Sequence, residues 1–193
     1  MYLSPRTRLR LIGLLPLLFF FAQIDHYWRI NQLGHMFWMC NIGNLLMAIG
    51  LFIEKPMLVR VAAIWTIPGL IVWFVYVVLA WGLFLSSTLA HVGGLAVAAF
   101  VVRAYGMDKI SWLYAFAWYL VVQILSRFIT SADLNVNMAH AVQPGWEQTF
   151  TSYWPFWLTL TIVTAVVLWL SGLFWRSFWP AVELNRRPAT STS

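Results

Sequence analysis

The chain has 193 residues, of which 62% are hydrophobic and only 9% are charged. An ordinary soluble domain carries roughly a quarter charged residues, so this composition excludes a protein whose whole surface faces water. The formal net charge of +6 indicates basic residues kept at a cytoplasmic membrane face, and we expect no nucleic-acid partner.

Six apolar segments predict an all-α fold, a multi-pass transmembrane helical bundle, because a helix satisfies its own backbone hydrogen bonds in lipid. Each segment is about long enough to cross a hydrocarbon core of ~30 Å. The boundary between the third and fourth helices is the least marked, because Ser86, Ser87 and Thr88 are the only run of consecutive polar residues within 58–104. We expect one transmembrane domain over 1–180 and a disordered cytoplasmic tail over 181–193. In chain order the predicted helices are 9–27, 35–53, 58–83, 86–104, 110–130 and 153–176.

The basic residues test this topology independently, because Lys and Arg concentrate on the cytoplasmic side of a membrane protein. With six crossings, both termini lie on the same side, and ten of the 12 basic residues fall there. Only Arg29 and Arg127 fall on the other side. We therefore expect both termini in the cytoplasm. The ten cytoplasmic residues are Arg6, Arg8, Arg10, Lys55, Arg60, Arg103, Lys109, Arg176, Arg186 and Arg187.

Polar side chains collect at the non-cytoplasmic ends of the predicted helices. Cys40 and His91 each lie about five residues into a helix, which places both roughly 7–8 Å below the outer boundary. That matched depth is close to where the ester carbonyls of phospholipids lie. The other members of this outer group are Asp25, His26, His35, Asn44, Ser87, Thr88, Gln123, Arg127, Asn135, Asn137 and His140.

Cys40 and His91 have the residue types of an acyl-transfer dyad, in which a histidine takes the proton of a nucleophilic thiol. A helix N-terminus favours the thiolate, but this effect fades within a turn, and the expected depth of Cys40 exceeds that. In the alternative interpretation, Cys40 is a small buried hydrophobic residue. His91 is then a histidine that forms a hydrogen bond across a close helix–helix contact at Gly93 and Gly94. Arg127 either extends to the outer interface or pairs with a lipid phosphate.

Several short runs carry a resemblance to a known family. Together they are similar to the bacterial YwaF-like membrane proteins, which are related to the eukaryotic transmembrane protein 164 family and more distantly to the androgen-induced lipid hydrolases. The resemblance covers about residues 36–172. The runs are Phe37 to Ile42, Leu45 to Ile49, Trp65, Pro68-Gly69, His91 to Gly94, Asn135 to Asn137 and Ser152 to Trp157.

The resemblance implies an acyltransferase or lipid hydrolase that acts on membrane lipids within a cell membrane, the inner membrane of a bacterium. The family's cysteine and histidine fall on Cys40 and His91, and its asparagine segment falls on residues 135–137. This segment reads Leu-Asn-Val-Asn-Met here, whereas the family has a form like Asn-Tyr-Met.

In the resulting hypothesis Cys40 attacks an acyl ester, and His91 acts as general base and then as general acid. Asn44 or Asn137 donates to the oxyanion, and Asn135 and Arg127 complete the substrate site. With one cysteine in the chain, we expect no disulfide, no metal site and no cofactor.

Two other functions fit the sequence. The small size, the absence of a predicted soluble domain and the aromatic surface also suit a non-catalytic subunit or assembly factor, with membrane-complex partner proteins or a homo-oligomer. Haem or quinone binding is the further alternative, since His26, His35, His91 and His140 lie toward one side, although only His91 is expected within a helix core.

Overall fold

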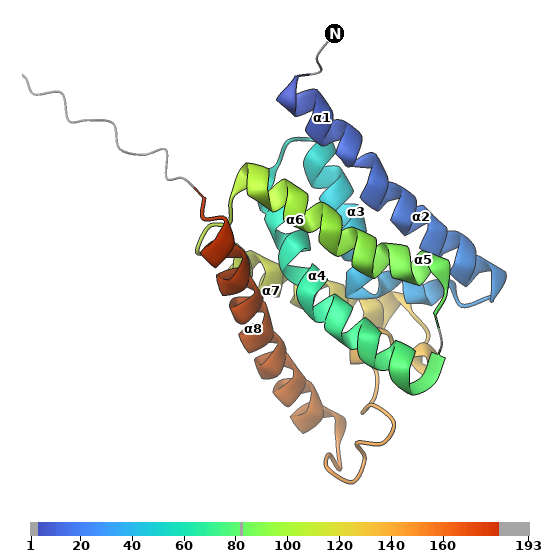
Figure 1. The fold of residues 1–193 in the computed structure, drawn as a ribbon. Helices are drawn as coiled ribbons and strands as arrows, with labels where there is room; N and C mark the ends of the chain where they lie inside the picture. Colours follow the sequence, from blue (N-terminus) through green and yellow to red (C-terminus); the bar gives the residue numbers. More distant parts are fainter. Residues whose placement is uncertain (1–3, 82, 182–193) are drawn as a thin grey trace, which may run out of the picture.

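The structure is a computed structural model that describes residues 4–81 and 83–181, and its helices run back and forth between two ends of one bundle (Figure 1). The predicted all-α, multi-pass architecture is confirmed. The α-helices are α1 (Pro5–Ile12), α2 (Leu14–Arg29), α3 (Met39–Phe52), α4 (Pro56–Tyr76), α5 (Leu85–Thr88), α6 (Gly94–Tyr105), α7 (Ser111–Ile129) and α8 (Tyr153–Phe178). Short 3₁₀ turns lie at Leu33–Phe37, Ala132–Leu134 and Val136–Met138, and π turns at Val77–Trp81 and Leu89–Gly93.

Five helical segments of the described chain are long and apolar enough to cross a membrane. Two of them join shorter helices, because α1 runs into α2 and α5 continues through a π turn into α6. The five spans are Arg6–Arg29, Pro56–Leu79, Leu85–Tyr105, Ser111–Ile129 and Tyr153–Phe178.

The second predicted helix is wrong at its outer end. We expected it over 35–53, but α3 begins only at Met39, and Leu33–Phe37 forms a 3₁₀ turn instead. The 14 residues of α3 measure about 21 Å, which is shorter than a hydrocarbon core of ~30 Å. Helix α3 by itself is therefore too short to span such a core.

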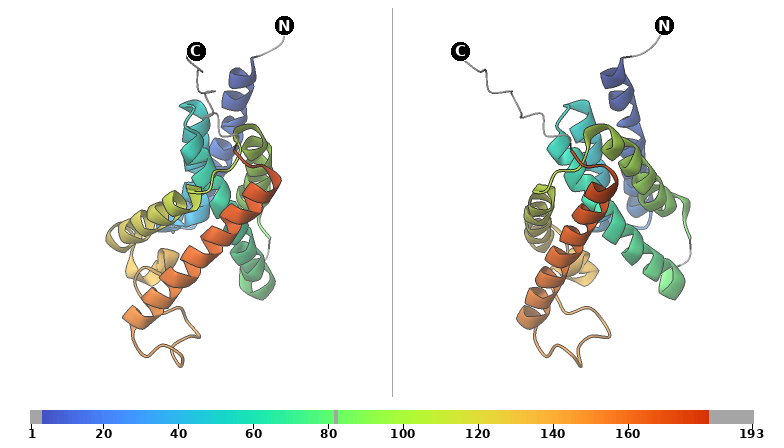
Figure 2. Two further views of the ribbon diagram at one scale, coloured as in Figure 1. Left: turned by 90° about the vertical axis from the view of Figure 1, so that its left-hand side faces the viewer. Right: turned by 60° about the vertical axis from the view of Figure 1, so that its left-hand side comes forward.

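Helix α4 is the centre of the bundle and packs against α3, α6, α7 and α8. Residues 59 and 61–65 in its first half are buried, and the indoles of Trp65 and Trp175 donate to the carbonyls of Ala115 and Ala63 at 3.1 and 2.9 Å. Its second half carries exposed apolar residues such as Phe74. Both views of Figure 2 show the second half of α4 diverging from the first half of α8, so the packing is closest toward the end of the bundle where α4 begins.

Polar contacts hold together the end of the bundle at which the chain starts. Arg10 pairs with Glu54 at 2.7 Å, which joins α1 to the α3–α4 turn. Arg60 at the start of α4 donates to the Gly106 carbonyl at 2.8 Å and pairs with Asp108, so it fixes the α6–α7 loop. These contacts place the start of the chain and the α3–α4 and α6–α7 loops at one end of the bundle.

The end of α8 lies at the same end of the bundle. The Met107 N–H donates to the Trp179 carbonyl at 2.7 Å, and the Ala181 N–H donates back to the Met107 carbonyl at 2.9 Å. Apart from Ala181, the predicted disordered tail lies outside the described residues.

Candidate functional site

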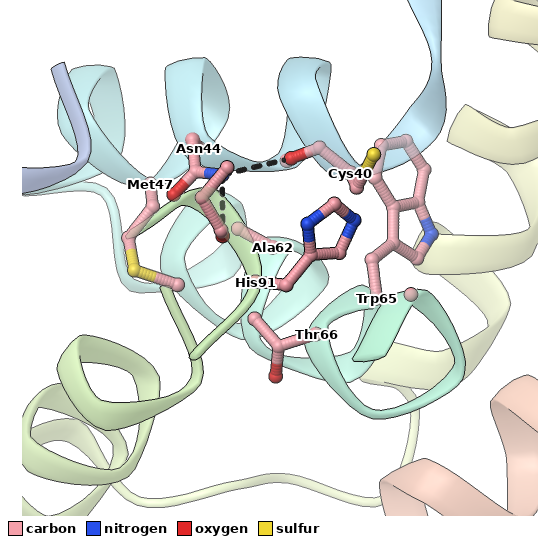
Figure 3. A pocket seen from close by; sticks show the side chains of 10 residues that line it. Cys40, Asn44, Met47, Ala62, Trp65, Thr66 and His91 are labelled. Carbon is pink, nitrogen blue, oxygen red and sulfur yellow. Dashed lines mark hydrogen bonds between the residues drawn. The ribbon is translucent and has the colours of Figure 1, made fainter. Parts of the chain in front are cut away.

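A small cavity between α3, α4 and the Leu89–Gly93 π turn contains both predicted catalytic side chains. Its volume is about 10 Å³, which is enough for about one water molecule. Figure 3 shows the side chains of Cys40 and His91 at this cavity, with Asn44 on one side of the imidazole and Trp65 on the other. The lining residues are Cys40, Gly43, Asn44, Met47, Ala62, Trp65, Thr66, Gly69, Ala90 and His91.

Cys40 is the second residue of α3, whereas the sequence placed it about five residues into its helix. The 3₁₀ turn before Trp38 causes this difference, and it brings the thiol into the first helical turn, where backbone N–H groups have no helical partner. The backbone N–H groups of Cys40 and Asn41 lie within hydrogen-bonding reach of the thiol sulfur. The thiol also makes a long contact of 4.0 Å to Oδ1 of Asn41.

His91 is held in one tautomer by the chain itself. Its Nδ1 lies 2.8 Å from the Ser87 carbonyl oxygen, and because a carbonyl only accepts, Nδ1 carries the proton. Nε2 is therefore the unprotonated nitrogen, as a general base requires. The ring also stacks on Trp73, with centroids 5.4 Å apart and planes 16° apart. His91 lies in a π turn, a feature that often occurs at functional sites.

The thiol and the imidazole share the cavity without bonding to each other. Among the described residues, no hydrogen bond joins Cys40 to His91. A proton can pass between such groups through one intervening water, and the cavity has room for one. The two side chains therefore line one cavity that has room for about one water molecule.

Asn44 has a different role from the predicted one. Its Nδ2 donates to the Cys40 carbonyl at 2.9 Å and to the Ala90 carbonyl at 3.0 Å. Both amide hydrogens are thereby used, and none remains for an oxyanion. Asn44 instead ties the first turn of α3 to the π turn that carries His91.

Asn137 caps α3 from another part of the chain. Its Oδ1 accepts from the Met39 N–H at 3.1 Å, and its Nδ2 donates to the Phe37 carbonyl at 2.7 Å and to Ser126 Oγ at 2.8 Å. It has a φ of 53°, in the left-handed region that asparagine tolerates. Asn137 thus has no N–H left for an oxyanion either, and it positions the turn that contains Cys40.

Asn135 and Arg127 lie outside the cavity. Oδ1 of Asn135 accepts from the N–H groups of His140 and Ala141 at 3.0 and 3.1 Å, so this side chain organises its own loop. Arg127 is exposed at the outer end of α7, donates to the Ala139 carbonyl and lies over the Tyr153 ring at 5.0 Å. The structure therefore does not bring these two predicted residues to Cys40 and His91.

The sequence analysis missed a buried polar chain that leads to the thiol. Ser86 Oγ donates to Gln23 Oε1 at 2.9 Å, and Gln23 Nε2 lies 3.4 Å from Asn41 Oδ1, the atom that the Cys40 thiol contacts. Gln23 and Asn41 are each only 1% exposed. The signal was present, since Gln23 interrupts a long apolar run and Asn41 follows Cys40 directly.

The contacts of the four histidines bear on the haem alternative, and His26 and His35 both pack on Tyr27. His26 stacks on Phe84, His35 accepts from the Trp38 indole and His140 lies within bonding distance of Thr130, while His91 has the partners described above. Within residues 4–81 and 83–181, no three His, Cys, Asp or Glu side chains gather at a position that could hold a metal ion.

The first turn of α3 leaves backbone N–H groups without a helical carbonyl partner, and the Cys40 N–H is among them. Backbone N–H groups of this kind commonly stabilise the oxyanion in acyl transfer. No protein-family model, no curated protein and no solved structure matches this chain.

Proposed function

We propose that this protein is a lipid acyltransferase or lipid hydrolase that works within the outer half of a bacterial inner membrane, with Cys40 as nucleophile and His91 as general base. Both termini then lie in the cytoplasm. The observation that carries the proposal is that Cys40 and His91, from two different helices, line one cavity while the His91 tautomer leaves Nε2 free to accept a proton. The resemblance to the YwaF-like proteins names the same two residues.

The first half of the reaction forms a thioester. The Cys40 thiol gives its proton to His91 Nε2 through a water molecule in the cavity, and the sulfur attacks the carbonyl carbon of an acyl ester. The Cys40 N–H donates to the developing oxyanion. The bond from the acyl carbon to the glycerol oxygen then breaks, and the imidazolium returns the proton to this leaving oxygen.

The second half releases the acyl group. Water attacks the thioester in a hydrolase, and the hydroxyl of a second lipid attacks it in a transferase, while His91 takes the proton of the attacking group. The carbon–sulfur bond breaks, and the thiolate recovers the proton from the imidazolium. The products are a lysolipid and either a fatty acid or a newly acylated lipid.

The position of the site favours a membrane lipid over a water-soluble substrate. Val92, next to His91, is 48% exposed, and Val72 on the outer half of α4 is 47% exposed. These apolar side chains face the lipid in a membrane-spanning helix. An acyl ester can therefore approach the cavity laterally, although a cavity sized for about one water must widen to admit it.

Lipid turnover by the purified chain in liposomes tests the proposal. With phospholipid labelled in its acyl chains, Cys40→Ala and His91→Gln each reduce labelled product by about 100-fold or more. Gly69→Ala has the same effect by occupying the cavity, since an added Cβ lies 3.6 Å from the Cys40 Cβ in ordinary contact and the fold is kept. Thr88→Ala, one turn from His91 but outside the cavity lining, retains turnover and serves as the matched control.

Three outcomes would count against the proposal. Undiminished turnover in Cys40→Ala removes the thiol from the mechanism. An inactive wild-type chain that purifies in gentle detergent as a stable heteromeric complex supports a non-catalytic subunit instead, and a haem absorption band would support the haem alternative.

A further inference from the structure

A second and larger cavity lies at the outer end of the bundle, between α8 and the loop that precedes it. Its volume is about 200 Å³, larger than an engineered apolar cavity of about 150 Å³ that admits benzene. Apolar side chains dominate its lining, among them Met138, Phe150, Phe156, Leu160 and Val163. Such a cavity suits a hydrophobic chain or ring, and it is separate from the cavity of Cys40 and His91.

A cation lies next to this cavity. Arg127 donates to the carbonyl of Ala139, the residue that follows the cavity-lining Met138, and the Tyr153 hydroxyl donates to the same carbonyl at 2.7 Å. The guanidinium lies over the Tyr153 ring at 5.0 Å and the Trp154 ring at 5.9 Å. These contacts hold the positive charge of Arg127 at the point where α7, the loop before α8 and the start of α8 meet.

Most of the hydrogen-bonding capacity of Arg127 is unused by the protein. A guanidinium has five N–H donors, and in the described part of the chain the Ala139 carbonyl and the Tyr153 hydroxyl are the groups that accept from it. Within the same residues Arg127 forms no ion pair, whereas Arg29, the other basic residue of this side, pairs with Asp25 at 2.8 Å. Arg127 is also exposed, so an anion can reach it.

We propose that the outer ends of α7 and α8 bind a glycerophospholipid, with its phosphate on Arg127 and one acyl chain in the cavity beside α8. The charge and the apolar space are adjacent, as the two ends of such a lipid require. Arginine binds phosphate through paired N–H donors, and Tyr153 and Trp154 suit the headgroup level of a membrane. This site does not depend on the acyl-transfer proposal, because none of its residues lines the Cys40 cavity.

Native mass spectrometry of the full chain in detergent, with dioleoylphosphatidylglycerol as the probe, tests the site. The wild-type chain retains the lipid, Arg127→Gln weakens binding by about tenfold, and Arg127→Lys weakens it less because the charge remains. Leu160→Trp, which fills the cavity from α8, weakens binding while Arg127 is intact. Arg29→Gln removes the other outer arginine and leaves binding unchanged.

Two further probes separate the lipid from its parts. Dioleoylglycerol, which has the chains without the phosphate, binds more weakly than the phospholipid, and inorganic phosphate does not displace the phospholipid. Equal retention by the wild type, Arg127→Gln and Leu160→Trp would overturn the proposal, as would an equal loss in Arg29→Gln. A melting curve for each variant confirms that the chain is folded.

Discussion

The side-chain oxygen of Asn137 accepts a hydrogen bond from the backbone N–H of Met39 over 3.1 Å, so a residue of the loop after α7 caps the first turn of α3. Cys40 is the next residue in that turn. The position of the thiol therefore depends on a side chain 98 residues later in the chain.

Asn137→Ala is predicted to destabilise the protein. The change removes a helix cap and two hydrogen bonds from a buried amide, a loss of about 2 kcal/mol. The measurement is the melting temperature in detergent, with Gln148→Ala, an exposed residue of the loop before α8, as the control. An unchanged melting temperature in Asn137→Ala would show that the cap does not hold α3.

Acidification is predicted to destabilise the loop before α3 through His35. Burial lowers the pKa of His35 below its ordinary value of 6.5, and the charge of Asp133 opposes this shift only in part. Because the unfolded chain then binds the proton more readily, stability falls as the pH drops below about 6.5. Protonation of His35 Nδ1 also removes the acceptor of the hydrogen bond that the Trp38 indole N–H donates over 2.9 Å.

The melting temperature between pH 7.5 and pH 5 measures this effect. His35→Gln keeps an acceptor in the same region but does not titrate, so its melting temperature is predicted to fall less over that range. Identical slopes for the wild type and His35→Gln would mean that other groups cause the pH dependence.

Arg60→Lys is predicted to cost about 1.5 kcal/mol of stability, because a point charge replaces a planar fork that holds the α6–α7 loop. Arg60 donates to the carbonyls of Gly106 and Tyr105 at 2.8 and 3.1 Å and pairs with Asp108. Arg10→Lys is the matched control at the same end, where a more exposed pair contributes less than about 1 kcal/mol. Equal effects in denaturation curves would contradict this difference.

The sequence predicted the helical segments closely where length and charge decide them. The segments at 110–130 and 153–176 correspond to Ser111–Ile129 and Tyr153–Phe178. In these regions an apolar run long enough for one crossing has no alternative to a helix in lipid. The positions of the basic residues predicted which helix ends lie on the same side, and the contacts of Arg10 and Arg60 agree with that prediction.

The outer end of α3 could not be predicted, because a distant residue determines it. Nothing near residue 35 forbids a helix, but Asn137 binds both the Phe37 carbonyl and the Met39 N–H and so supports a loop there. The sequence placed Cys40 and His91 at the same end of their helices, although Cys40 lies nearer the start of its helix than predicted. The roles of Asn44 and Asn137, in contrast, depend on which carbonyls their amides reach. Those contacts join segments far apart in the chain and leave no local pattern.

The topology predicts that the loop before α8 faces the outside of the cell. A Cβ added at Gly145 meets no atom within 4 Å, so a protease recognition sequence can be inserted after this residue. A protease added to intact spheroplasts is expected to cut it, while a reporter fused to the C-terminus stays protected. If the protease cuts this loop only after the cells are lysed, the loop faces the cytoplasm and the predicted topology is wrong.

The central claim is that Cys40 carries the acyl group during turnover. The most direct measurement is mass spectrometry of the Cys40 peptide after acid quenching of the protein during steady turnover of labelled phospholipid in liposomes. The account predicts an acyl thioester on Cys40 that neutral hydroxylamine removes and that His91→Gln reduces strongly. Sustained lipid turnover with Cys40 found unmodified would contradict it.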